Sequence, residues 1–384
     1  MNYVIDSIQS LSFSHKAELS LINLLLYEID EFDYEVRRCL AQYPGSSLEN
    51  KIRGIIKISK LLLKDHYCSI DLKCFETFER FLRAAGKRDH FIHQFEVFLL
   101  GWAILRYYFK IENDTENIRD KFNWWLITAL SHDIGYPVKA SIDISKKLEN
   151  IYNNRNTNSI SKIFNNSYTN LSNKLHLSDK YVIRTQGGVS SFVNKALYQI
   201  IKSRKDSKAL TDCMKKELNH GYNSALLLYD GLFFEGKKEK IIHDTNASLA
   251  CSAIILHSVS HKTHPNIIDK IDIKENPFAY VLYLVDCLQE WDRPDDIDSN
   301  YPEFILDDFK IISSTNTIKI KFILKHNNWN EYLVNEQIEY ISKKEEIINS
   351  MNTKNQRFNI KVKYTCTNLK LNENSIGIPK LDLN

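Results

Sequence analysis

Histidines and aspartates, whose side chains can bind divalent cations, stand in apolar helix-forming segments at five points of the chain. The set comprises His93, the adjacent pair His132 and Asp133, His220, His257 and Asp286. The pair belongs to the stretch ALSHDIGYP, residues 129 to 137, which ends an apolar run. Buried imidazoles and carboxylates cost free energy unless they are hydrogen-bonded, paired or bound to a metal. A divalent-cation site would account for all of these residues together.

Each of these residues, taken alone, also has a purely structural explanation. His93 falls on a helical stripe with Val97 and Ile104, where a lone imidazole is more often a hydrogen-bonded core residue than a ligand. Asp286 is harder to explain, because a buried carboxylate needs a partner and the nearest basic residue, Arg293, is two turns away. The structural explanation would have to hold on five separate helices.

The residue types also restrict the metal. Imidazole and carboxylate ligands together suit Zn, Mn, Fe, Co or Mg. The seven cysteines contain no CxxC pair, which argues against a closed structural zinc site and, with their odd number, indicates reduced thiols. We therefore expect one or two divalent ions in an open site of the kind that activates water.

Several helices are needed to bring these residues together. In the segments that carry them, apolar residues recur at spacings of three and four, as in amphipathic helices. The segments span residues 89–109, 120–137, 211–234, 245–259 and 277–291. Gly135 and Pro137 end the second segment directly after the His-Asp pair. The pattern predicts a mainly α protein.

Three parts of the chain are predicted from these patterns. Residues 1–86 form a helical N-terminal layer, and residues 87–300 form the helical body that carries the candidate ligands. An Asn- and Ser-rich insertion interrupts this body at about 138–205. Residues 301–384 contain alternating stretches that predict a hairpin and a further strand, with a polar helix between them. This C-terminal part is a small α/β appendage.

The order of the candidate ligands resembles the HD superfamily of metal-dependent phosphohydrolases. In that family a histidine, an adjacent His-Asp pair and a distant aspartate occur on consecutive helices, and the stretch HDIGYP is similar to the central motif. The stretches HQFEV and LYLVDCLQEWDRP resemble the helices of the first and last ligands. The resemblance covers roughly residues 87–300 and implies an HD-type helical bundle.

The resemblance also implies a role for each candidate. Asp133 would bridge two metal ions and orient a metal-bound hydroxide for attack on phosphorus, which makes it the implied catalytic residue. Four residues would bind the first ion: His93, His132, Asp133 and Asp286. Two later histidines would hold the second ion: His220 and His257.

The resemblance fixes the chemistry better than the substrate. Deoxynucleotide triphosphohydrolases usually carry a histidine after the doublet, where this chain has Tyr136, and an arginine before the first histidine, where it has His90. Cyclic-nucleotide phosphodiesterases fit six ligands, but the motif of the cyclic-dinucleotide branch is missing. We expect a phosphohydrolase of one of these two kinds acting on a small nucleotide; a nuclease or a non-catalytic nucleotide sensor is the alternative. Three side chains are candidates for phosphate contacts: Arg88, Lys139 and Arg293.

The charge balance favours a small substrate over a polymer. The 51 basic and 48 acidic residues leave a formal net charge of +3, which does not favour a nucleic-acid partner. No apolar run reaches the roughly 18 residues of a membrane span, and the N-terminal residues lack a basic leader. We therefore expect a cytoplasmic protein without a membrane partner. The appendage is a candidate for contacts with a regulatory partner or a second copy of the chain.

Overall fold

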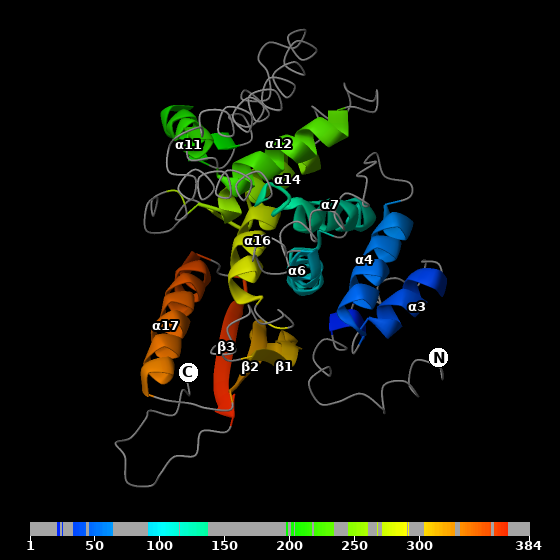
Figure 1. Cartoon of the computed structure of the whole chain (residues 1–384). Coiled ribbons are helices and arrows are strands. Elements are labelled where there is room, and N and C mark those ends of the chain that lie inside the picture. The colour runs from blue at the N-terminus through cyan, green and yellow to red at the C-terminus, as the bar shows by residue number, and fades with distance from the viewer. Residues whose placement is uncertain are drawn as a thin grey trace, which may run out of the picture. The chain divides into compact units, whose positions relative to one another are not determined.

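The computed structural model is mostly helical with one small sheet (Figure 1), which confirms the predicted mainly α class. It describes residues 21–23, 25, 34–43, 46–63, 91–114, 116–136, 197–198, 201–202, 204–216, 219–233, 245–259, 267, 271–289, 291, 303–326, 331–354 and 357–367. Most of the predicted insertion at about 138–205 lies outside these residues. None of the helices within the described ranges is both long enough and apolar enough to cross a membrane.

Two compact units divide the chain, and neither is continuous in sequence. The first unit comprises Met1–Leu62, Phe95–Ile118 and Leu284–Asn384, and the second comprises Leu63–Gln94 and Arg119–Tyr283. The predicted domains were continuous segments with boundaries at residues 86 and 300, whereas each compact unit combines separate segments of the chain. The predicted boundaries therefore stay predictions.

The first unit contains a set of helices that bury apolar stripes: α3 (Tyr34–Gln42), α4 (Leu48–Leu62), most of α6 (Phe91–Ile111) and α17 (Glu331–Lys354). In α4, Ile55 and Ile58 are fully buried at the three-residue spacing of one helix face. The buried carboxylate of Glu96 in α6 accepts hydrogen bonds from Tyr43 Oη, at 3.3 Å, and from Gln289 Nε2. These bonds satisfy a carboxylate that would otherwise be costly to bury.

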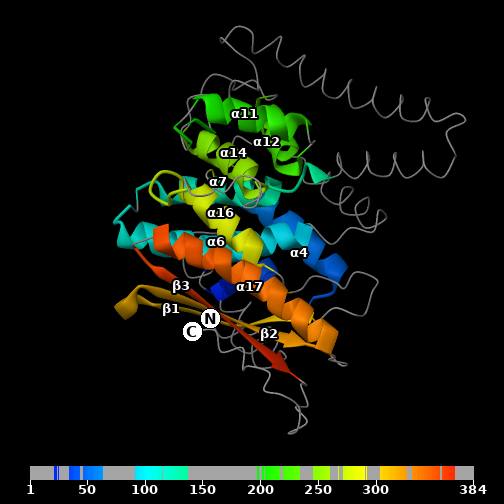
Figure 2. The same ribbon diagram turned by 90° about the vertical axis from the view of Figure 1, so that its left-hand side faces the viewer.

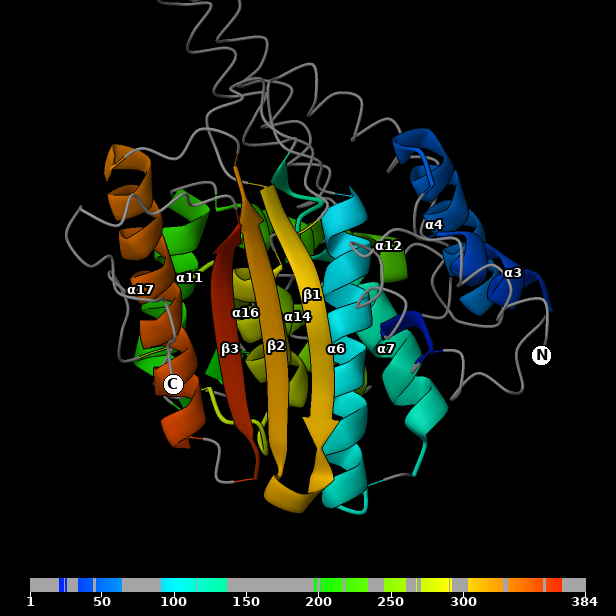
Figure 3. The same ribbon diagram turned by 90° about the horizontal axis from the view of Figure 1, so that it is seen from below.

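The sheet of the first unit has the strand order β1-β2-β3, with β1 (Glu303–Ile312), β2 (Thr317–Lys325) and β3 (Asn359–Thr367). Strands β1 and β2 pair antiparallel, which confirms the predicted hairpin, with a register shift between Leu306 and Asp308. Strands β2 and β3 pair parallel, so the chain must cross over between them, and α17 makes this connection. Figure 3 shows α17 beside β3 and α6 beside β1.

One face of this sheet is apolar and buried. On β2 the side chains of Ile318 and Phe322 are fully buried and alternate with lysines. The Phe322 ring stacks with Trp291 and Tyr364, at centroid distances of 6.1 and 5.3 Å. The two-residue periodicity that predicted the strand therefore separates an apolar face from a polar face.

The second unit is built on five described helices: α7 (Ile118–Ser131), α11 (Arg204–Lys216), α12 (His220–Phe233), α14 (Thr245–His257) and most of α16 (Pro277–Leu288). All of them except the amphipathic α11 are rich in apolar residues. Every residue of α7 from Phe122 to Ser131 is buried, as expected for a helix surrounded by others. Its Trp125 packs on Phe278 of α16, with ring centroids 5.9 Å apart. Helices α12 and α14 lie side by side (Figure 2).

Candidate metal centre

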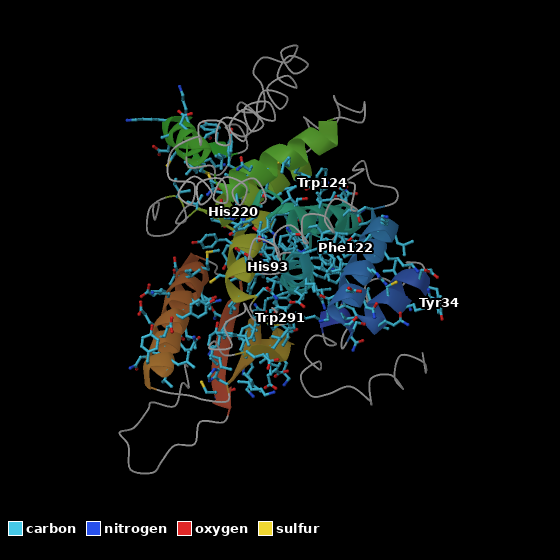
Figure 4. The ribbon with its side chains drawn as sticks, viewed as in Figure 1. Tyr34, His93, Phe122, Trp124, His220 and Trp291 are labelled. Carbon is cyan, nitrogen blue, oxygen red and sulfur yellow. The ribbon has the colours of Figure 1, made fainter. Side chains whose placement is uncertain are left out.

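Five of the six predicted metal ligands come together in the second unit. His93 lies in the first turn of α6, the pair His132 and Asp133 directly follows α7, His220 is the first residue of α12 and His257 is the last residue of α14. Their ligand atoms form two groups that share Asp133 and could hold a metal ion. Figure 4 labels His93 and His220, one from each group.

The two oxygens of Asp133 face two different pairs of histidines. Oδ2 lies 3.4 Å from Nε2 of His132 and 3.8 Å from Nε2 of His93. Oδ1 lies 3.5 Å from Nε2 of His257 and 3.6 Å from Nε2 of His220. One carboxylate is therefore positioned between two imidazole pairs, with one oxygen for each pair.

The spacing within each pair fits two ligands of one ion. The Nε2 atoms of His93 and His132 are 3.3 Å apart, and those of His220 and His257 are 3.2 Å apart. Two nitrogen ligands about 2.1 Å from one ion and about 100° apart lie about 3.2 Å from each other. Each pair, together with one oxygen of Asp133, thus offers three ligand atoms to a divalent cation.

Backbone carbonyls set the orientation of one histidine in each pair. Nδ1 of His132 donates to the carbonyl oxygen of Ala129 at 2.7 Å, and Nδ1 of His257 donates to that of Ile254 at 2.5 Å. A carbonyl oxygen can only accept a hydrogen bond, so Nδ1 carries the proton in both rings. In the neutral ring the lone pair of Nε2 then points toward Asp133, which is the tautomer that a metal requires.

The ends of two helices explain these hydrogen bonds. The last four carbonyls of a helix have no partner within the helix, and Ala129 and Ile254 occupy such positions in α7 and α14. Each carbonyl accepts from the histidine three residues later. After His132 the chain turns, with Tyr136 N donating to the Asp133 carbonyl at 3.0 Å. Adjacent side chains at this turn can therefore aim at one point.

Gly135 lets this turn approach the start of α12 closely. Its backbone N–H donates to Ser224 Oγ at 2.8 Å. A Cβ atom at this position would lie 2.2 Å from the carbonyl oxygen of His220 and 2.7 Å from the backbone nitrogen of Ser224. Contacts this short involve rigid backbone atoms, so only glycine fits without a shift of α12.

A second set of contacts joins the start of α12 to the end of α14. Asn219 caps α12, since its Oδ1 accepts from Tyr222 N at 3.1 Å. The same oxygen accepts from Ser258 Oγ at 2.7 Å. A Cβ atom at Gly221 would lie 2.3 Å from Ser258 Oγ and 2.6 Å from the carbonyl oxygen of Ile254. These contacts fix the two helix ends that carry His220 and His257.

The ring of Tyr136 stacks on His220, with centroids 4.1 Å apart and planes 22° apart. The side chain of His220 is 16% exposed, whereas those of His93, His132 and His257 are at most 2% exposed. The stacking tyrosine therefore restrains the most accessible imidazole. The sequence indicated Tyr136 only as a departure from a family motif and gave no signal of this contact.

The other supporting residues were also missed. Ser224 and Ser258 carry no pattern that would distinguish them from ordinary helix-surface serines. Asn219 precedes His220 and Gly221 at the start of an apolar run, and asparagine is a preferred helix N-cap. That signal could have located the beginning of α12, although not the contact with α14.

The remaining predicted site residues are not part of the two groups. Asp286 is half-buried on α16 in the first unit and belongs to neither group of described residues, so its role as a ligand stays a prediction. The three residues predicted to contact phosphate lie outside the described residues: Arg88, Lys139 and Arg293. Their predicted phosphate contacts therefore stay predictions.

Sulfur does not contribute to either group of described residues. Cys251 lies in α14, and burial raises the pKa of its thiol to about 12. A thiol with such a pKa remains protonated at neutral pH and is a poor metal ligand. The donor set of imidazoles and one carboxylate therefore agrees with the expected site for Zn, Mn, Fe, Co or Mg, and the ion itself is not identified by it.

Comparisons of the chain with models of protein families, with curated proteins and with solved structures found no match.

Replacing His257 by alanine should remove one metal ion and leave the other. The variant loses a ligand of the Oδ1 pair, whereas the Oδ2 pair of His93 and His132 is untouched. We expect the affinity for the second ion to fall at least about a hundredfold, measured by calorimetric titration with Mn²⁺. His326→Ala, which changes a histidine of the first unit outside both groups, is the matched control. Loss of both ions together, or of neither, would contradict the separate pairs.

Proposed function

We propose that the chain is a metal-dependent phosphohydrolase of the HD type that holds two divalent ions. The observation that carries this proposal is the position of Asp133, with Oδ2 toward His93 and His132 and Oδ1 toward His220 and His257. A carboxylate shared in this way is the expected bridge of a two-ion site. The order of these residues along the chain supports the HD resemblance.

The charge of the site supports a phosphate-containing substrate. Two divalent ions with one carboxylate and neutral imidazoles leave a strong excess of positive charge in a buried place. A phosphoryl group brings the negative charge that offsets it. When bound, the ions would supply Lewis-acid activation of water and of the phosphoryl group.

The chain's own residues would hold and orient this centre. His132 and His257 keep their Nε2 lone pairs toward the centre through bonds to backbone carbonyls, and Asp133 fixes the separation of the two halves. Burial of Asp133 and three of the histidines keeps the electrostatic interactions strong. His220, the most exposed of the five residues, marks the side from which a substrate approaches.

The proposed substrate is a small nucleotide, cleaved either as a nucleoside triphosphate or as a cyclic nucleotide. Purified protein with Mn²⁺, Co²⁺ or Mg²⁺ is to be tested against dNTPs, NTPs, cyclic mono- and dinucleotides, DNA and RNA, with products identified by mass. Release of tripolyphosphate indicates the triphosphohydrolase, and a linear monophosphate from a cyclic substrate indicates the phosphodiesterase. Cleavage of polymers alone contradicts the proposal in favour of a nuclease. Tight nucleotide binding without turnover would favour the sensor.

A further inference from the structure

The solvent-facing side of the sheet is rich in lysine. On each strand the outward residues alternate with the buried apolar residues. Six lysines occupy the outward positions: Lys310 on β1, Lys319, Lys321 and Lys325 on β2, and Lys361 and Lys363 on β3. All of them are exposed except Lys321, which is half-buried. We call these six residues the lysine face.

The strand register places lysines directly opposite one another. Lys319 is opposite Lys310 on one side and opposite Lys361 on the other. In the next row, Lys321 is opposite Lys363. Like charges directly opposite each other destabilise a sheet, so folding alone does not favour this arrangement.

Three of these lysines lie close to carboxylates of β1 within the described part of the chain. Asp308 pairs with Lys310 at 2.6 Å and Asp307 pairs with Lys321 at 2.5 Å. A third contact, Glu303 to Lys325, is 3.9 Å long. Among the described residues, these three contacts all involve carboxylates of β1, whereas Lys319 on β2 and Lys361 on β3 lie opposite other lysines. The formal net charge of +3 is a sum over the whole chain and therefore does not indicate this local group of lysines.

We propose that the lysine face binds the phosphate backbone of a nucleic acid, independently of the metal centre. Lysines two residues apart on a strand are about 6.7 Å apart, and adjacent strands are about 4.8 Å apart. The longer spacing is about twice the 3.4 Å rise per nucleotide of one DNA strand. An extended polyanion can therefore meet several lysines at once. Figure 3 looks onto this side of the sheet, and no described helix crosses in front of it.

The residue types favour a nucleic acid over a lipid surface. Membrane-surface sites combine basic residues with exposed apolar or aromatic anchors. Among the described residues, the large exposed hydrophobic side chains are Tyr34, Tyr198, Tyr332 and Tyr340, and none of them belongs to the sheet. Lysine contacts to phosphate carry no base recognition, so binding is independent of sequence and weakens steeply with salt.

The test is fluorescence anisotropy of the full chain with labelled single- and double-stranded oligonucleotides. A chelator prevents turnover, so the result does not depend on the proposed hydrolase activity. The double variant Lys319→Glu and Lys361→Glu should bind at least about tenfold more weakly, with a shallower dependence on salt. The matched control is Lys205→Glu with Lys208→Glu, two exposed lysines of α11, which should bind like the wild type.

The thermal midpoint separates this effect from misfolding. The sheet variant turns the like-charge contact between positions 310 and 319 into an opposite-charge pair and keeps a like-charge contact between positions 319 and 361, so its midpoint should stay close to that of the wild type. Three results would overturn the proposal: no oligonucleotide binding by the wild type, equal loss in the two double variants, or binding only to vesicles of anionic lipid.

Discussion

Replacing Asp133 by alanine should abolish metal binding and hydrolysis together while the helical fold remains. Both carboxylate oxygens face imidazole pairs, so this single change removes a ligand from each half of the centre. We expect turnover of any substrate found for the wild type to fall at least about a thousandfold, which corresponds to about 4 kcal/mol of lost transition-state stabilisation. Elemental analysis and turnover are measured on the same preparation, with circular dichroism as the check on folding.

Glu96→Gln is the control for that experiment. Glu96 is also a buried carboxylate, but it accepts hydrogen bonds from Tyr43 and Gln289 in the first unit and belongs to neither metal group. The amide would set an N–H group against one of these donors, so this variant should lose stability and keep its metal content. Unchanged metal content and turnover in Asp133→Ala would show that the site is wrongly assigned.

The second large effect is expected from Gly135→Ala. The added methyl group would lie 2.2 Å from the His220 carbonyl oxygen and 2.7 Å from Ser224 N. Because backbone atoms of α12 cannot move aside singly, the helix start must shift, and the free energy of unfolding should fall by about 3 kcal/mol. The shift also moves His220, so the affinity for the second ion should fall as well. Chemical denaturation and Mn²⁺ titration measure the two effects.

Gly54→Ala is the matched control for the glycine variant. Gly54 lies inside α4, and a Cβ atom there would meet nothing within 4 Å. Alanine should therefore stabilise the helix by up to about 1 kcal/mol, because it loses less backbone entropy on folding. If Gly135→Ala and Gly54→Ala changed the free energy of unfolding by equally small amounts, the close approach of the turn to α12 would be disproved.

The chemistry of the site could be predicted from the sequence further than its geometry. An imidazole or carboxylate in an apolar helix needs a partner, and this requirement selected the five residues that meet in the second unit together with Asp286, which belongs to neither group of described residues. The pairing of His132 with His93, and of His257 with His220, depends on how the helices pack. The resemblance of the ligand order to the HD family implied these two pairs, but no pattern along the chain gives the distances between their nitrogen atoms.

For the sheet, too, the sequence predicted the elements but not how they pair. Two-residue alternation predicted its strands and separated the apolar side chains from the lysines. The rows in which Lys319 stands between Lys310 and Lys361 arise from strand register, which depends on turns and tertiary packing. Net charge sums over the whole chain and therefore could not indicate this face. Asp286 is the one predicted metal ligand that is supported by the sequence alone, because it belongs to neither group of described residues.

The central claim is that one carboxylate joins two metal ions, and the most direct measurement is anomalous diffraction from crystals of the wild type grown with Mn²⁺. We predict two anomalous peaks per chain, about 3.5–4 Å apart, one bound by His93 and His132, the other by His220 and His257, with Asp133 contacting both. A single peak that leaves His220 and His257 unbound, or no peak at these residues at saturating Mn²⁺, would contradict the account.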